Sequence, residues 1–81
     1  MSIVYGLSAD ADTTAEVRNI AGRLIRAIPC GVASAGLNTA TWNLRNGTGA
    51  AVPAGMYLCT ITARSENGSQ ATAVRTVNVR R

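Results

Sequence analysis

The chain contains no histidine, no lysine and no phenylalanine, and it has only two cysteines among its 81 residues. Without histidine there is no Ser-His or Cys-His pair of the kind that activates a nucleophile. Two thiols alone are also too few for a closed tetrahedral zinc site. The sequence therefore predicts a protein that is not an enzyme and that has no catalytic residues, no cofactor and no metal site.

Carboxylates are scarce as well, and only Asp10 and Asp12 lie close together in the sequence. A calcium ion takes roughly six to eight oxygen ligands, and few further candidates surround this pair. Aspartate side chains commonly hydrogen-bond to their own backbone in turns. We therefore expect a polar turn at residues 8–12 rather than a calcium site.

The formal net charge is +4, from eight arginines set against four acidic residues. The arginines are spread along the chain, and aromatic residues do not alternate with them as they do in grooves that bind nucleic acid. No apolar run approaches the roughly 18 residues of a membrane span. We expect neither a nucleic-acid partner nor a membrane span, and an export signal, if the protein is exported, is expected upstream of Met1.

A chain of this length is expected to form one domain, residues 1–81, that buries about 60 to 65% of the surface exposed by the unfolded chain. The core must come largely from isoleucine, valine, leucine and alanine. Because alanine fills little volume, we expect a thin domain that a neighbouring domain, a cross-link or self-association helps to stabilise.

Short segments of alternating polarity, separated by turn residues, favour an all-β fold. Residues 2–7 and 11–18 alternate clearly. A turn at Gly22 then precedes a short strand over 24–28, and an alternative helix over 15–28 stays open on propensity. Residues 29–37 are predicted as a loop, because Pro29 cannot serve a central strand. Further strands are expected at 38–44, 56–64 and 69–79.

Trp42 is the largest apolar side chain, and alternation directs it into the core. The segment Val52-Pro53-Ala54-Gly55 is predicted to form a corner, because proline fixes φ and glycine accepts a dihedral that a Cβ would oppose. We expect this corner to direct Tyr57 and its strand at Trp42.

Two further features concern cross-links and hairpins. Asn67-Gly68 between two alternating runs predicts a hairpin with a type I′ turn. A disulfide between Cys30 and Cys59 would constrain the unfolded chain by about 3 to 4 kcal/mol. The alternative, that Cys59 is a small buried apolar residue while Cys30 lies in a loop, is favoured by the position of Cys59 on the face of Tyr57.

The order of these landmarks resembles a known family. The motifs are Tyr5-x-Leu7, Ala11 with Val17, Gly22-Arg23 with Ile25-Arg26-x-Ile28, Gly36-x-Asn38 with Trp42, and Val52-Pro53-x-Gly55-x-Tyr57. Together they are similar to the FlgD-type immunoglobulin-like domain and to related C-terminal modules of bacterial secreted and surface proteins. The resemblance implies an immunoglobulin- or fibronectin III-like antiparallel β-sandwich of about seven short strands. Asn43, where the family usually has aspartate, and Ala15, where it usually has a larger apolar residue, depart from the pattern.

The resemblance implies no catalytic residue. We expect a non-catalytic structural or interaction module of an exported bacterial protein, located outside the cell or at its surface. Its partner would be another protein, a neighbouring domain of the same polypeptide, or a second copy in self-assembly. The alternative is a β-sandwich that binds a carbohydrate or an anionic ligand, although sugar binding normally needs exposed aromatic side chains.

Overall fold

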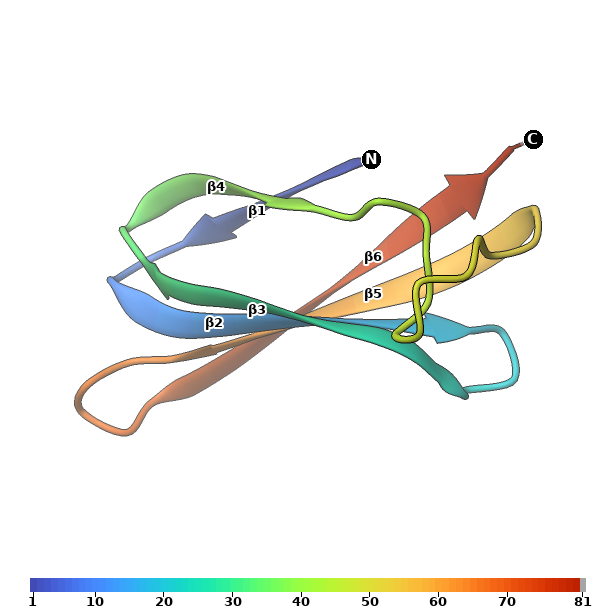
Figure 1. Cartoon of the computed structure of the whole chain (residues 1–81). Coiled ribbons are helices and arrows are strands. Elements are labelled where there is room, and N and C mark those ends of the chain that lie inside the picture. Colours follow the sequence, from blue (N-terminus) through green and yellow to red (C-terminus); the bar gives the residue numbers. More distant parts are fainter. Residues whose placement is uncertain (81) are drawn as a thin grey trace.

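The computed structural model describes residues 1–80 and is built from six β-strands (Figure 1). In chain order they are β1 (Ser2–Leu7), β2 (Ala11–Asn19), β3 (Leu24–Ala33), β4 (Gly36–Thr41), β5 (Gly55–Arg64) and β6 (Gln70–Val79). The predicted all-β class is confirmed, with six strands in place of about seven. The helix that propensity allowed over residues 15–28 is excluded, since β2 and β3 occupy that segment.

The strands form two antiparallel sheets that stack on each other (Figure 1). The smaller sheet pairs β1 with β4, and the larger has the order β3-β2-β5-β6. The smaller sheet thus has two strands where the larger one has four. Among the described residues, one edge lacks a neighbouring strand in each of β1, β3, β4 and β6.

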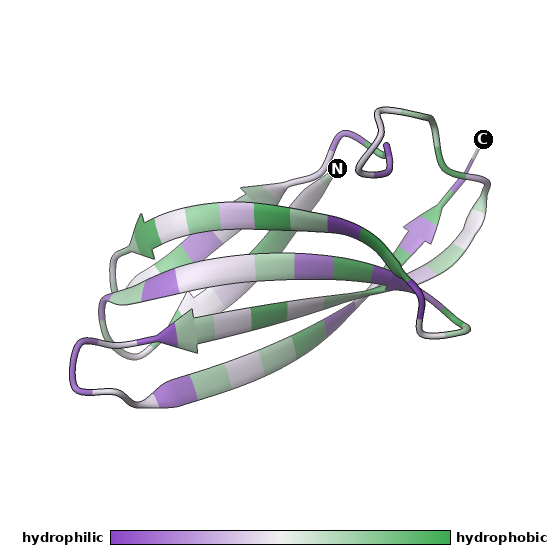
Figure 2. Cartoon of the chain, turned by 60° about the horizontal axis from the view of Figure 1, so that its bottom comes forward, coloured by the Kyte–Doolittle hydropathy of each residue, from purple (hydrophilic) through white to green (hydrophobic). Residues whose placement is uncertain are grey.

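Figure 2 shows hydropathy varying from residue to residue along the strands, and burial alternates along β2 and β5. In β2, Ala15 and Val17 are buried while Asp12 and Thr14 are exposed. In β5 the buried set is Tyr57, Cys59, Ile61 and Ala63. A period of two residues is what a strand with one solvated face requires.

Pro29 was predicted to lie in a loop over residues 29–37, and this prediction is wrong. Strand β3 continues through Pro29 to Ala33, and β4 begins at Gly36. The reason is that β3 lies at the edge of its sheet, and Pro29 faces Thr14 next to an irregularity in the β2–β3 register. Proline is tolerated at such a position because the edge has no further strand to which it must donate.

The hairpin predicted at Asn67-Gly68 joins β5 to β6, but the expected type I′ turn is wrong. Gly68 has a φ of 86°, whereas Asn67 does not have a positive φ. The Gly68 N–H donates to the Ser65 carbonyl at 3.0 Å, and the Ser65 N–H donates to Ser69 at 2.9 Å. This is a three-residue loop in which a type I turn is followed by a left-handed glycine.

The same loop design occurs twice more. Gly22 and Gly49 have φ values of 86° and 90°, and their N–H groups donate to the carbonyls of Asn19 and Asn46 at 2.9 and 3.0 Å. The Asn19 and Asn46 side chains also accept backbone N–H groups within their own loops. Glycine is favoured at the third loop position because a Cβ would be strained at positive φ.

Candidate functional site

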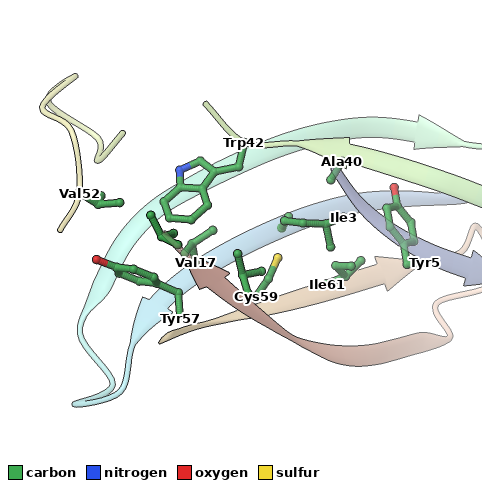
Figure 3. Close-up of a cluster of buried hydrophobic side chains, with 12 residues drawn as sticks. Ile3, Tyr5, Val17, Ala40, Trp42, Val52, Tyr57, Cys59 and Ile61 are labelled. Atoms are coloured by element: carbon green, nitrogen blue, oxygen red, sulfur yellow. The ribbon is translucent and has the colours of Figure 1, made fainter. Parts of the chain in front are cut away.

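Trp42 lies immediately after β4 and is completely buried at the centre of the core (Figure 3). Its indole Nε1–H donates to the Arg45 carbonyl at 2.9 Å. Its ring meets the Tyr57 ring in an edge-to-face arrangement, with centroids 5.5 Å apart and planes at 70°. This geometry suits the quadrupoles of two aromatic rings.

The segment before β5 brings Tyr57 to this position. The Tyr57 hydroxyl donates to the Pro53 carbonyl at 2.7 Å, which closes the corner across four residues. Gly55 begins β5 with a φ of 151°, a conformation that residues with a Cβ rarely adopt. Val52 is buried beside Trp42 (Figure 3). These contacts fully engage the polar atoms of both aromatic side chains.

The loop between Trp42 and Pro53 is held by its own polar groups. The side-chain oxygen of Asn43, which stands where the family usually has aspartate, accepts the Arg45 N–H at 3.1 Å. The Arg45 guanidinium donates to the Gly49 carbonyl at 2.9 Å. Leu44 adopts a φ of 63°, which is uncommon for a residue with a Cβ.

Cys30 and Cys59 are both free thiols, Cys30 half-buried and Cys59 fully buried. The sequence left a disulfide between them open, but β2 separates their strands β3 and β5. Two strand spacings amount to about 9 to 10 Å, beyond the roughly 4.4 to 6.8 Å between Cα atoms that a disulfide requires. Burial, with a smaller contribution from Cys30, raises the pKa of the Cys59 thiol above its ordinary value. Cys59 is therefore protonated at neutral pH and is a poor nucleophile.

Asp10 and Asp12 line a hollow of about 610 Å³, which Arg64 and Glu66 also line. Asp10 accepts the Ala35 N–H at 2.8 Å and so ties the β1–β2 turn to the β3–β4 connection. Among residues 1–80, no group of three or more histidine, cysteine, aspartate or glutamate side chains is arranged to bind a metal ion. Asp10 therefore has a structural contact in the turn. The predicted turn over residues 8–12 is too long, because β2 begins at Ala11 and contains Asp12.

The three aromatic side chains are all buried, so none offers a stacking platform for a sugar ring. Three of the exposed large apolar side chains lie on the outer face of β5 and β6. Met56, Leu58 and Val74 are exposed by 54%, 38% and 54% respectively. We call these three residues the outer patch. Alternation in the sequence separated Leu58 from the face of Tyr57, but only the β5–β6 register shows that Leu58 lies diagonally across from Val74.

The β5–β6 register runs without a bulge from Gly55 to Gln70, so Val74 lies on the solvated face because of simple alternation. No helix formed by residues 1–80 is long and apolar enough to cross a membrane.

Comparisons with known proteins were made on sequence and on structure. The family model of the FlgD Ig-like domain matches residues 1–68. No curated protein matches the chain. The crystal structure of FlgD from P. aeruginosa matches with a TM-score of 0.82 and 18% sequence identity. That match covers 93% of this chain, but the chain spans only 57% of the length of that structure. The chain therefore belongs to the FlgD Ig-like domain family, as a non-catalytic β-sandwich module.

Proposed function

We propose that residues 1–81 form one domain that serves as a structural and interaction module of an exported bacterial protein, outside the cell or at its surface. Strand β6 lies beyond the part matched by the family model, yet it pairs with β5 from Gln70 to Val79. That pairing supports a single unit. In this proposal the partner is another protein or a neighbouring domain of the same polypeptide.

The core and corner residues Trp42, Tyr57, Pro53, Gly55 and Gly22 maintain this fold and take no part in chemistry. Burial of Trp42 and Tyr57, and the positive φ of both glycines, support that role. A module of this kind acts through surface residues, which the strands and loops hold in position.

The outer patch is the observation that carries the proposal. Contiguous exposed apolar groups on a small soluble domain commonly mark a protein contact. Threonines flank the patch, since Leu58 pairs with Thr76 and Val74 pairs with Thr60. Arg18 lies opposite Leu58 on β2 and provides a charged rim. An apolar centre with arginine at its border is typical of protein interfaces.

A matched pair of substitutions tests this role. Leu58→Asp places a charge in the outer patch, and Thr72→Asp places one on the same exposed face outside it. Each change is made in the gene of the bacterium that produces the protein, and the exported protein is fractionated by size in its native state. We expect the Leu58→Asp protein to be exported and folded but to be absent from the high-molecular-weight assembled fraction. The Thr72→Asp protein should appear in that fraction like the parent.

Normal assembly of the Leu58→Asp protein would contradict the proposal. A glycan array supplies the second discriminating result. Specific binding of a sugar by the parent domain, unaffected by Leu58→Asp, would favour the carbohydrate-binding alternative.

A further inference from the structure

Strand β1 has a free edge whose backbone groups can be identified. Met1 and Trp42 exchange two hydrogen bonds, each of 2.8 Å, at the end of the β1–β4 ladder. In an antiparallel pair such exchanging positions recur at every second residue. The residues of β1 that bond to β4 are therefore Ile3, Tyr5 and Leu7. It follows that the N–H and C=O groups of Ser2, Val4 and Gly6 point to the opposite, free edge.

Nothing in β1 itself blocks this edge. Natural edge strands are commonly protected by proline, bulges or charged side chains. Strand β3 has Pro29 and two register irregularities against β2. Strand β1, with the sequence SIVYGL, has none of these protections. Its free edge is thus competent to pair with another strand.

The inner face of β6 is left partly uncovered next to this edge. Val77 and Val79 are buried, whereas Ala71 and Arg75 on the same face are exposed. Arg75 lies opposite Cys59, which is completely buried. The smaller sheet therefore covers β5 but stops short of β6 over this stretch.

Two hollows follow the uncovered line. One of about 230 Å³ is lined by residues 1–4 and 75–78, and one of about 460 Å³ is lined by residues 6–9 together with Ala63, Gln70 and Ala71 among others. We call these two hollows the β1–β6 groove. An added strand would lie about 4.8 Å beyond β1, on the side where this groove is found.

Arg75 is the only charged side chain that lines the β1–β6 groove. Its recorded hydrogen bond is to the neighbouring Val74 carbonyl at 3.1 Å. Among residues 1–80 the ion pair is between Arg18 and Glu16, so no carboxylate of the described chain compensates Arg75. The groove thus has walls of small, apolar and uncharged polar side chains, and Arg75 has no carboxylate partner among residues 1–80.

We propose that the β1–β6 groove binds an extended segment of a protein partner, which adds a third strand to the β1–β4 sheet. The main chain of the segment bonds to Ser2, Val4 and Gly6. Its inward side chains are small or apolar, and one aspartate or glutamate pairs with Arg75. Strand addition of this kind takes affinity from main-chain hydrogen bonds and specificity from alternate side chains. The inference rests on the proposed function as an interaction module and names the chemistry of the partner.

The test uses synthetic peptides of about eight residues, long enough to span β1. The first alternates threonine with valine and has one central glutamate. The second has glutamine in place of glutamate, and the third has N-methyl groups on alternate backbone nitrogens. Each is titrated into the isotope-labelled chain, and backbone amide resonances and hydrogen exchange are followed by NMR. We expect the glutamate peptide to slow exchange at Val4 and Gly6, the glutamine peptide to bind about tenfold more weakly, and the N-methyl peptide not to bind.

A charge reversal provides the specific control. The Arg75→Glu variant should no longer bind the glutamate peptide and should bind a peptide with lysine in place of that glutamate. Arg64→Glu, at an exposed position on β5, should leave the peptide preference unchanged. Thermal melts establish that both variants are folded. Leu58→Asp should still bind the peptide, because the outer patch lies on the other face of the sheet.

Three results would overturn the proposal. One is no amide perturbation in β1 at about 1 mM peptide. Another is equal affinity of the parent and the Arg75→Glu variant for the glutamate peptide. The third is protection of Val4 and Gly6 that grows with protein concentration alone, which would assign the groove to a second copy of the chain. None of these results affects the outcome of the Leu58→Asp assembly experiment, so the two proposals fail separately.

Discussion

Replacing Trp42 by alanine should remove most of the stability of the domain. Trp42 is completely buried, pairs edge-to-face with Tyr57 and donates to the Arg45 carbonyl. Truncation of a buried tryptophan to alanine costs about 3 to 5 kcal/mol. At about 0.05 to 0.15 kcal/mol per residue, a domain of 81 residues has roughly 4 to 12 kcal/mol in total. Trp42→Ala is therefore expected to leave a marginal or unfolded chain.

Smaller changes in the same cluster should give a graded series. Tyr57→Phe removes only the hydroxyl that donates to Pro53, and we expect a loss of about 1 kcal/mol. Trp42→Phe keeps an aromatic ring but loses the indole N–H and some volume, so its cost should lie between those of Tyr57→Phe and Trp42→Ala. The order matters more than the individual values, since relaxation around each site differs.

Urea unfolding followed by circular dichroism measures all three variants in one way. For the parent, tryptophan fluorescence gives an independent check, because a buried indole emits at shorter wavelength than one in water. Emission typical of water-exposed indole in the native protein, unchanged by urea, would refute the reasoning. So would a Trp42→Ala protein with the same unfolding midpoint as the parent.

Three further predictions concern backbone conformation and pH. Gly49→Ala should cost about 1 kcal/mol because φ is 90° there, whereas Gly47→Ala, in the same loop without a positive φ, should be close to neutral; equal melting temperatures would contradict this. Gly55→Val should cost more than about 1 kcal/mol and Ala54→Ser less than about 0.5, and equal tolerance in a thermal melt would show that the corner is not constrained as described. Burial raises the pKa of the Cys59 thiol in the folded state. The protonated thiol therefore stabilises the fold fully below the ordinary thiol pKa of about 8.5. This stabilisation is lost as pH rises through the pKa of the folded state. Urea midpoints of the parent should therefore fall more steeply at alkaline pH than those of Cys59→Ala, and parallel curves would refute that cause.

Alternation alone predicted most of the strands, because each strand has one buried face. The segments at Ser2–Leu7, Ala11–Asn19 and Gly55–Arg64 were found within a residue or so of their predicted bounds. Pro29 was misassigned for a physical reason. The rule against proline applies to strands with neighbours on both sides, and the edge position of β3 depends on sheet order, which local sequence does not contain.

The candidate surfaces depended even more on topology. Alternation separated Leu58 from the face of Tyr57, but the proximity of Leu58 and Val74 follows from the β5–β6 register. The free edge of β1 follows from a smaller sheet of only two strands. The separation of Cys30 from Cys59 likewise requires knowledge that β2 lies between their strands. Pairings between distant segments of the chain decide all three features.

Protection of Met56 in the native assembly is the most direct test of the claim that the domain acts by protein contact. Met56 belongs to the outer patch and is 54% exposed in the domain alone. Limited peroxide treatment followed by mass spectrometry measures its oxidation to the sulfoxide in the isolated domain and in the exported protein purified in its assembled state. We expect rapid oxidation in the isolated domain and strong protection in the assembly. Equal oxidation rates in the two states would contradict a protein contact at the outer patch.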